Sequence, residues 1–384
     1  MHKRLTKNPR GVENRFGLKQ NLTNFDGFND DGYLLISDWD EVEKSSLNLL
    51  KLSSGEILHT WKTPLEQIEN LEELDIPLPM PQGKDRVGLG PGILTQDGAI
   101  ISVGGEGGVL MKVDLCSNVE WLLNDYFHHD INQDHEGNIW ISSVLFPNEI
   151  GEKFLADYRD DAIAKISPDG ELLYKESVSK ILMDNGLGYL IFGVGPLEED
   201  AIHLNDITPA LNDGEFWKRG DLLVSLRHRS LVFLYRPSTE EIVWYQLGPW
   251  ANQHDPDFVG THRISVFGND VTSSRNNRVS NEASMIMDHN NLYLVDLRSG
   301  ETTTPYTELF READIKTVTG GWADILENGD IVIKESKFGR YIRGTYDKPQ
   351  WYYVDLLDDG EITRGDARYF PELDTSIFEE ANCD

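Results

Sequence analysis

Cysteine is scarce in this sequence, whose 384 residues include only two, Cys116 and Cys383. Two thiols are too few for a disulfide framework or for a zinc site built from several cysteines. Cys383 also lies beside the C-terminus, in a tail that we do not expect to be rigid. We therefore expect neither a structural disulfide framework nor a metal–thiolate site.

Long hydrophobic runs are absent as well. The longest, 188–197, is interrupted by glycines and is too short to span a bilayer. The N-terminal segment 1–20 is basic but lacks the apolar core of a secretory signal, and the chain begins with Met. We therefore expect a cytoplasmic protein without a membrane-spanning segment, or a periplasmic one if a signal has been removed.

Basic residues are few, since 35 Lys and Arg stand against 66 Asp and Glu, giving a net charge of −31. Such a surface repels nucleic acids and anionic membranes and is typical of a well-solvated protein, so we expect neither as a partner. An anionic substrate would approach this protein against its average field. Any anion site must therefore contain its own local positive groups.

The sequence is rich in short β-prone segments that follow turns. A glycine-containing turn followed by four to six β-prone residues recurs at 32–37, 98–103, 137–142, 220–225 and 329–333, and 262–267 has the same strand without the glycine. Further turns with Asp-Gly, at 169–170 and 359–360, supply the positive φ angles that two-residue hairpin loops need. Strands that pair with their neighbours in repeated units bury both faces when the sheets stack radially.

These units predict an all-β fold, a six-bladed β-propeller with four-stranded antiparallel blades joined by loops and short helices. We expect an N-terminal extension, 1–24, which lends a strand to the last blade, a propeller domain, 25–370, and a C-terminal tail, 371–384. In a propeller the innermost strands line a central channel. We take the recurring strands as these innermost strands.

Four stretches place imidazole and guanidinium groups at strand ends, namely 128–130, 203–206, 225–228 and 253–255. One histidine is usually a satisfied structural residue, but His128 or His129, His203 and His254 precede recurring strands in three consecutive units. Arg227 follows a β-prone run, and strand alternation predicts that Arg227 and Arg229 share a face that His228 does not. We expect these side chains to meet at one end of the channel.

Histidines beside a permanently charged, forked guanidinium suit a tetrahedral oxyanion such as sulfate or phosphate. A neutral imidazole also attacks such a centre and divides one group transfer into two half-reactions through a covalent intermediate. Zinc ligation by the three histidines is the competing interpretation, but a nearby arginine is unusual at a zinc site. The residues favour anion-group transfer without a metal or another cofactor.

Several runs in the chain resemble the arylsulfate sulfotransferase family. They are HLNDI at 203–207, LLVSLRH at 222–228, IVWYQLG at 242–248, QH at 253–254 and SVFGND at 265–270. The unit around 128–130 and the turn 327–330 fit as well, so the resemblance covers about 25–365. It implies a six-bladed propeller that moves a sulfuryl group from a phenolic sulfate ester to another phenol without a nucleotide donor.

The resemblance also implies roles for individual residues. His254 is the expected nucleophile and forms a transient sulfohistidine, while His203 and Arg227 hold the sulfuryl oxygens. His129 is expected as a further oxygen ligand or acid/base group, with His128 as the alternative, and His128 and Asn205 as substrate-binding residues. The implied partners are a small aryl sulfate donor and a phenolic acceptor.

Two other functions remain open from the sequence. The same pocket suits a different reaction on an aromatic or sulfated metabolite, such as hydrolysis or alkyl transfer, because a fold does not fix its chemistry. A propeller that binds an anion without catalysis is the third hypothesis. Only about 20 residues precede the first blade, where exported family members carry a signal and a small pairing domain, so both a monomer and a homodimer stay open.

Overall fold

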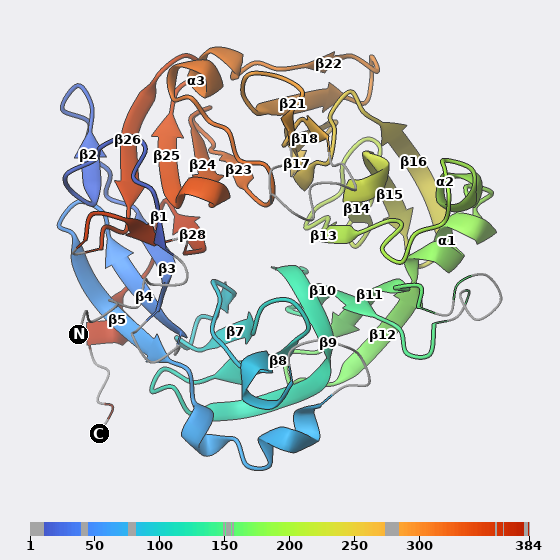
Figure 1. The fold of residues 1–384 in the computed structure, drawn as a ribbon, viewed down its shortest axis with the longest axis horizontal. Helices are drawn as coiled ribbons and strands as arrows, with labels where there is room; N and C mark the ends of the chain where they lie inside the picture. Colours follow the sequence, from blue (N-terminus) through green and yellow to red (C-terminus); the bar gives the residue numbers. More distant parts are fainter. Residues whose placement is uncertain are drawn as a thin grey trace, which may run out of the picture.

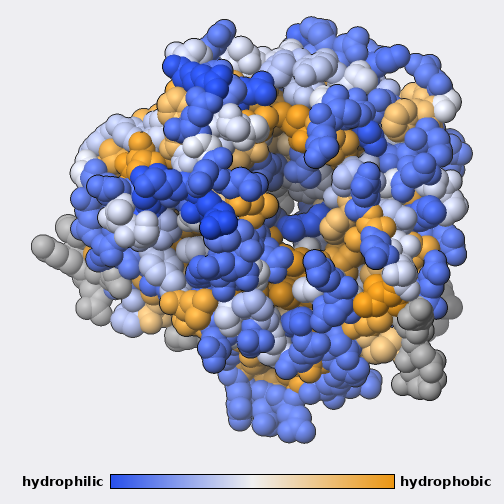
Figure 2. Space-filling view, turned by 180° about the vertical axis from the view of Figure 1, so that it is seen from behind, coloured by the Kyte–Doolittle hydropathy of each residue, from blue (hydrophilic) through white to orange (hydrophobic). Residues whose placement is uncertain are grey.

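The computed structural model of the chain describes residues 11–39, 45–75, 82–148, 150, 155, 157–272, 284–357, 359–363, 365–379 and 383. Antiparallel sheets succeed one another around a common centre, with short helices at the periphery (Figure 1). The surface is mostly hydrophilic on the face shown in Figure 2 and is hollowed near its middle. The fold is therefore all-β and propeller-like, as the sequence predicts.

The first two sheets contain the ends of the chain and the longest strand. In pairing order, one sheet consists of β28 (Ala367–Phe370), β3 (Tyr33–Trp39), β4 (Ser45–Lys51) and β5 (Glu56–Lys62). The next sheet consists of β6 (Ile93–Leu94), β7 (Ile100–Val103), β8 (Gly108–Val113), β9 (Val119–Gln133), β10 (Ile139–Val144), β11 (Asp161–Ile166) and β12 (Leu172–Ser177).

Three more sheets complete the ring. The first is β13 (Leu204–Pro209), β14 (Leu222–Leu226), β15 (Leu231–Arg236) and β16 (Glu241–Leu247). The second is β17 (His254–Val259), β18 (Arg263–Gly268), β21 (Asn291–Asp296) and β22 (Thr302–Thr303). The third is β23 (Trp322–Ile325), β24 (Ile331–Glu335), β25 (Arg340–Gly344), β26 (Pro349–Val354) and β2 (Leu22–Asn24).

Shorter elements connect these sheets. Two-stranded ladders join β1 (Gly11–Val12) to β27 (Ile362–Thr363) and β19 (Val271–Thr272) to β20 (Ser284–Met285). The α-helices are α1 (Val178–Asp184), α2 (Tyr189–Phe192), α3 (Thr307–Glu312) and α4 (Ser376–Glu379). The 3₁₀ turns are η1 (Leu65–Gln67), η2 (Leu71–Leu74), η3 (Gly83–Arg86), η4 (Arg227–Arg229) and η6 (Ser336–Phe338). No described helix combines the length and apolar character that crossing a membrane requires.

The recurring strands of the sequence are β3, β7, β10, β14, β18 and β24. Five of them lie next to the first strand of their sheet in pairing order, and β10 lies next to β9 within the seven-stranded sheet. The expectation that they line the channel is therefore wrong. The strands that precede them in pairing order, such as β17, are nearer the centre in Figure 1. The second strands are apolar because neighbouring sheets cover both of their faces, whereas the inner strands carry polar side chains toward the channel.

Both ends of the chain take part in closing the ring. The N-terminal β2 pairs with β26 at the outer edge of the last sheet, through Leu22–Tyr353 and Asn24–Trp351. The C-terminal β28 pairs with β3 in the first sheet. An open edge on the first or the last sheet would expose unpaired backbone groups. The two strand pairings protect both edges where the ring closes.

The hydrophobic core lies between adjacent sheets. In one cluster, Ile163 of β11, Leu182 of α1, Leu204 of β13, Leu222 of β14 and Phe233 of β15 are all fully buried. Burying each such side chain contributes about 1.5–3 kcal/mol. This packing fixes the relative positions of β9 and β13, and therefore of the histidines at their ends.

A disulfide joins Cys116, in the turn between β8 and β9, to Cys383, with 5.2 Å between the Cα atoms. The expectation of no structural disulfide is therefore wrong. The two cysteines are 267 residues apart in sequence, but β28 brings the C-terminal segment back to the first sheet, beside the second. Phe378 of α4 then packs edge-on against Trp61, with 5.7 Å between the ring centroids, which orders the tail.

Candidate functional site

Three neighbouring inner strands carry the candidate histidines at their starts. His254 is the first residue of β17, His203 immediately precedes β13, and His128 and His129 lie where β9 begins to pair with β10. In each strand the register shifts at this point, which marks a β-bulge. His129 and His203 also have left-handed backbones, with φ of 61° and 54°, which costs about 1–3 kcal/mol each and is typical of functional sites.

His254 is buried, with 6% of its surface exposed, and its Nδ1 lies 2.6 Å from Oδ1 of Asn269. The Asn269 amide nitrogen donates to the carbonyls of Thr317 and Gly320, which leaves its oxygen to face the imidazole. Nδ1 of His254 therefore carries the proton, and Nε2 is an unprotonated acceptor. The backbone N–H of Gly320, at 3.3 Å, points toward that Nε2.

Burial holds the pKa of His254 well below its usual value, and the positive charge of Arg227 lowers it further. His129 and His203 act in the same direction. An amide partner such as Asn269 does not supply the negative charge that would balance an imidazolium. His254 is therefore neutral at physiological pH, with Nε2 unprotonated.

His203 has a carboxylate partner instead. Its Nδ1 lies 2.6 Å from Oδ2 of Asp200, and its ring stacks on His228 with 4.5 Å between centroids. Burial alone would raise the pKa of Asp200, but the hydrogen bond and charge of His203 hold that pKa well below its usual range. Asp200 is therefore a carboxylate at physiological pH, and it accepts a hydrogen bond from Nδ1 of His203.

The two adjacent histidines differ in access. His128 is fully buried, whereas His129 is partly accessible and meets the edge of His203, with 5.0 Å between centroids. His129 is therefore the member of the pair that faces the other histidines. His128 cannot contact a bound molecule in this arrangement, so its expected substrate-binding role has no support from the geometry.

Arg227 begins the turn η4 after β14, and its Nη1 lies 2.9 Å from Nε2 of His228. The expectation that Arg227 and Arg229 share a strand face away from His228 is wrong, because these three residues form a 3₁₀ turn rather than a strand. Among the described residues, no carboxylate lies within ion-pair distance of Arg227. A largely buried guanidinium without a paired anion is a ready site for an anionic group.

Asn205 lies at the bulge of β13 and is 1% exposed. Its amide nitrogen donates to the carbonyl of Gln253, at 2.7 Å, while its Oδ1 has no protein partner in the part of the chain that the structure describes. Asn205 thus connects the His203 strand to the residue before His254. Its expected role in binding substrate stays a prediction.

Four residues near the histidines were not predicted from the sequence. Arg159 donates from Nε to Asp161 and from Nη1 to Glu106, at 2.8 and 2.7 Å, and lies over the ring of Tyr126. Its positive charge helps to lower the pKa of His129, after burial and His203. These residues come from three separate segments, and no local sequence pattern distinguishes them from surface charges.

Carboxylates follow the histidines along the same inner strands. Asp130, Asp206, Asp255, Asp257 and Asp324 come from β9, β13, β17 and β23. Burial, followed by mutual repulsion, raises the pKa of every one of them, to about 6 for Asp130. For Asp324, burial raises the pKa to about 6 although Arg368 opposes the shift. The channel is therefore acidic beyond the histidines.

Within the part of the chain that the structure describes, three sets of side chains have potential metal-ligand atoms within 4.8 Å of one another: Glu106, His128 and His129; Asp200, His203 and His228; and Asp255, Asp257 and Asp324. In the first set, both nitrogens of His128 already contact protein groups. In the second set, Arg227 contacts His228 and would repel a cation. The third set has the all-oxygen composition that hard cations prefer.

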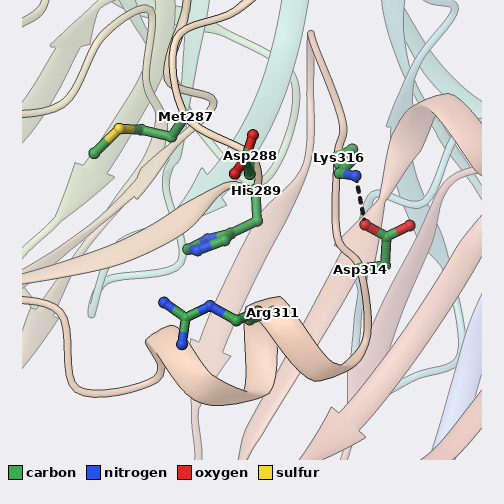
Figure 3. A pocket seen from close by; sticks show the side chains of 6 residues that line it. All are labelled: Met287, Asp288, His289, Arg311, Asp314 and Lys316. Atoms are coloured by element: carbon green, nitrogen blue, oxygen red, sulfur yellow. Dashed lines mark ion pairs between the residues drawn. The ribbon is translucent and has the colours of Figure 1, made fainter.

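A pocket of about 300 Å³ lies beside α3 (Figure 3). It is lined by Met287, Asp288, His289, Arg311, Asp314 and Lys316. The Arg311 and His289 side chains point toward each other, and Lys316 pairs with Asp314 at 2.6 Å. None of the predicted site residues lines this pocket.

Comparison with solved structures finds distant similarities over most of the chain. A protein of unknown function from Bacteroides caccae is 13% identical, with a TM-score of 0.49 and coverage of 88% of this chain and 99% of the other. A streptogramin B lyase is 13% identical (TM-score 0.44, coverage 91% and 97%). The Pan2 WD40 domain of Neurospora crassa is 10% identical (TM-score 0.47, coverage 91% and 93%).

Among curated proteins, no sequence matches this chain. A family model of the arylsulfotransferases (ASST) matches residues 93–350. This match covers well over half of the chain and includes every candidate residue from His128 to Asn269. The chain belongs to the arylsulfotransferase (ASST) family.

Proposed function

We propose that the protein transfers a sulfuryl group from a phenolic sulfate ester to a phenolic acceptor, in two half-reactions through a sulfohistidine at His254. The observation that carries this proposal is the pairing of a neutral, buried His254 with the uncompensated charge of Arg227. A neutral imidazole is a nucleophile, and an unpaired guanidinium binds a sulfate ester. The two groups together suit attack on an anionic sulfur centre.

The first half-reaction follows from the tautomer of His254. Its Nε2 lone pair forms a bond to sulfur, while the bond between sulfur and the ester oxygen breaks and its electron pair leaves with the aryl oxygen. Nδ1 keeps its proton and its hydrogen bond to Asn269 during attack, so the ring needs no external base. Nε2 gives up its long hydrogen bond from the peptide N–H of Gly320 as the bond to sulfur forms.

Arg227 and His203 would hold the sulfuryl oxygens. The guanidinium offers several N–H donors, and the hydrogen bond from Nδ1 to Asp200 orients the His203 ring. Positive groups aimed at the developing charge are usually the largest single contribution to such a transfer, about 2.7–4 kcal/mol for one donor. In the second half-reaction, the acceptor oxygen attacks sulfur, the bond to Nε2 breaks, and neutral His254 is restored.

We also infer that the sheets form six blades. The strand β9 serves two of them, since its first part pairs with β8 up to Phe127 and its second part pairs with β10 from Phe127 to Gln133. The seven-stranded sheet then divides into two four-stranded blades that share this strand. An experimental structure in which β9 pairs with β8 along its whole length would contradict this count.

The proposed function is tested with a chromogenic nitrophenyl sulfate as donor and phenol as acceptor. We expect sulfated phenol as the product and, with donor alone, a mass increase of one sulfuryl group on the intact protein. His254→Asn should lower the rate at least about 10³-fold and remove the mass increase. The matched control is His262→Asn, in the turn between β17 and β18, which should keep full activity. Equal activity in both variants would reject His254 as the nucleophile.

A further inference from the structure

His128 and His129 share a hydrogen bond between their rings, since their Nδ1 atoms lie 2.6 Å apart. The other nitrogen of His128, Nε2, lies 3.3 Å from the carbonyl oxygen of Ser143 and 3.6 Å from Oδ1 of Asp161. A carbonyl oxygen only accepts hydrogen bonds, so Nε2 of His128 carries a proton. His128 is fully buried, and these contacts therefore face no competition from water.

The positions of the ring protons follow from this geometry. Burial, followed by the charge of Arg159, holds the pKa of His128 well below its usual value, and burial and His203 lower the pKa of His129 to about 3. Both rings are neutral and carry one proton each. Because His128 uses its proton at Nε2, its Nδ1 accepts, and Nδ1 of His129 donates. His129 is thereby left with an unprotonated Nε2.

We propose that His128 is a positioning residue, which, with Ser143 and Asp161, fixes the tautomer of His129 so that Nε2 of His129 accepts the proton of the incoming phenol. This inference rests on the proposed function. It also replaces the expected contact between His128 and substrate with an action through His129.

The proton balance of the acceptor half-reaction is then complete. The phenol oxygen forms a bond to sulfur as the bond from sulfur to Nε2 of His254 breaks, and that electron pair returns to His254. The phenolic proton moves to Nε2 of His129. Because the pKa of His129 is about 3, it then releases this proton to water, and in the next donor half-reaction the aryl group leaves as a phenolate that takes a proton from water.

The relay is anchored to the rest of the site. Oδ2 of Asp161 accepts from the backbone N–H of Leu204, at 2.7 Å, and its Oδ1 accepts from Nε of Arg159, at 2.8 Å. Leu204 follows His203 directly, so one carboxylate ties the His128 relay to the strand of a second site histidine. His129, with its left-handed backbone, lies in β9 next to His128, where the pairing of β9 with β10 shifts register.

The test compares His128→Phe with His128→Asn. Phe removes the acceptor for the Nδ1 proton of His129. The amide oxygen of Asn takes the place of Nδ1 of His128 and restores that acceptor. His262→Asn again serves as the matched control. Ring-nitrogen NMR of the substrate-free protein reports the tautomer of His129 directly, and thermal unfolding verifies that each variant is folded.

Kinetics provide the second measurement. For His128→Phe, we expect formation of the sulfohistidine from nitrophenyl sulfate to stay within about threefold of the unsubstituted protein, while transfer to phenol, whose pKa is about 10, falls about 10²-fold. Transfer to a nitrophenol, which is already largely ionised, should fall less than about fivefold because it needs little base assistance. His128→Asn should recover most of the lost rate.

The outcomes separate the two proposals. If the unsubstituted protein forms no sulfohistidine, the proposed function fails, while the tautomer of His129 in the two variants still decides whether His128 positions it. If transfer occurs but both variants keep the tautomer and lose equal rates with all phenols, the role of His128 is wrong.

Discussion

Two regions of the inner strands differ in charge although they follow one another along the same strands. His129 and His254 belong to a cluster of imidazoles beside Arg227, whereas Asp130 and Asp255, one residue further on, belong to a cluster of carboxylates. Within the first cluster the groups suit an anion, and within the second they repel one another. The net charge of −31 therefore gives no indication of the charge at the site.

The histidine partners show the same contrast on a smaller scale. Asn269 supports a neutral His254 by accepting a hydrogen bond from its Nδ1, whereas Asp200 offers His203 a full negative charge. This difference between the partners is the basis for the proposed roles of His254 in nucleophilic attack and of His203 in anion binding. Substitutions that exchange these properties test the comparison.

The largest effect is expected from removing the unpaired positive charge. Arg227→Ala should lower kcat/KM about 10³-fold, because a group that stabilises the developing charge on the sulfuryl oxygens is lost. Arg229→Ala is the matched control, since Arg229 lies in the same turn but donates to the carbonyl of His228, and its loss should be less than about tenfold. Steady-state kinetics with a nitrophenyl sulfate measure both. Similar losses would mean that the turn, rather than the Arg227 charge, is required.

An intermediate effect is expected when His254 receives the kind of partner that His203 has. In Asn269→Asp the carboxylate stabilises the imidazolium form and raises the pKa of His254, so less of the nucleophile is neutral. The donor half-reaction should fall about 10–100-fold at pH 6 and recover as the pH rises, while the unsubstituted protein shows no such recovery. Asn328→Asp, at an exposed turn, adds the same charge without this effect. A loss that does not depend on pH would contradict the assignment.

The smallest effect, on stability alone, is expected in the carboxylate cluster. The folded protein raises the pKa of Asp324 to about 6, so the folded state binds an additional proton and stability falls as the pH rises from about 4 through 6. Asp324→Asn removes the cost of ionising Asp324 in the folded state. It should stabilise the protein by about 1–3 kcal/mol at pH 8 but not at pH 4. Thermal unfolding at both pH values measures the change in stability. The activity of the variant should stay within about twofold of that of the unsubstituted protein. Destabilisation at pH 8 would mean that the carboxylate has a favourable partner.

The sequence predicts the apolar second strands better than the inner strands. Strands such as β10 and β14 are buried throughout, and their continuous β-prone pattern is visible in the sequence. The inner strand β17, with the sequence HDPDFV, has no such pattern because its side chains face the channel rather than the core. The histidines themselves were found through their residue types and their places ahead of the recurring strands.

The rest of the site depends on contacts between segments far apart in sequence. Asn269 meets His254 across adjacent strands, and the carbonyls of Thr317 and Gly320 orient its amide. Asp161 lies close to His128, although a long loop separates the two residues in the sequence. Such partners are ordinary polar residues in the sequence, and only their positions in space set the proton arrangement of the rings.

The sequence by itself determined the all-β class, the recurring strands and the set of His254, His203, His129 and Arg227, because β-prone patterns and residue chemistry are local properties. The tertiary structure decided that His254 is neutral, that His128 is fully buried while His129 is partly accessible, and that Cys116 meets Cys383. These outcomes depend on burial and on partners tens to hundreds of residues away. Ring closure and sheet packing bring those partners together, and no local pattern records them.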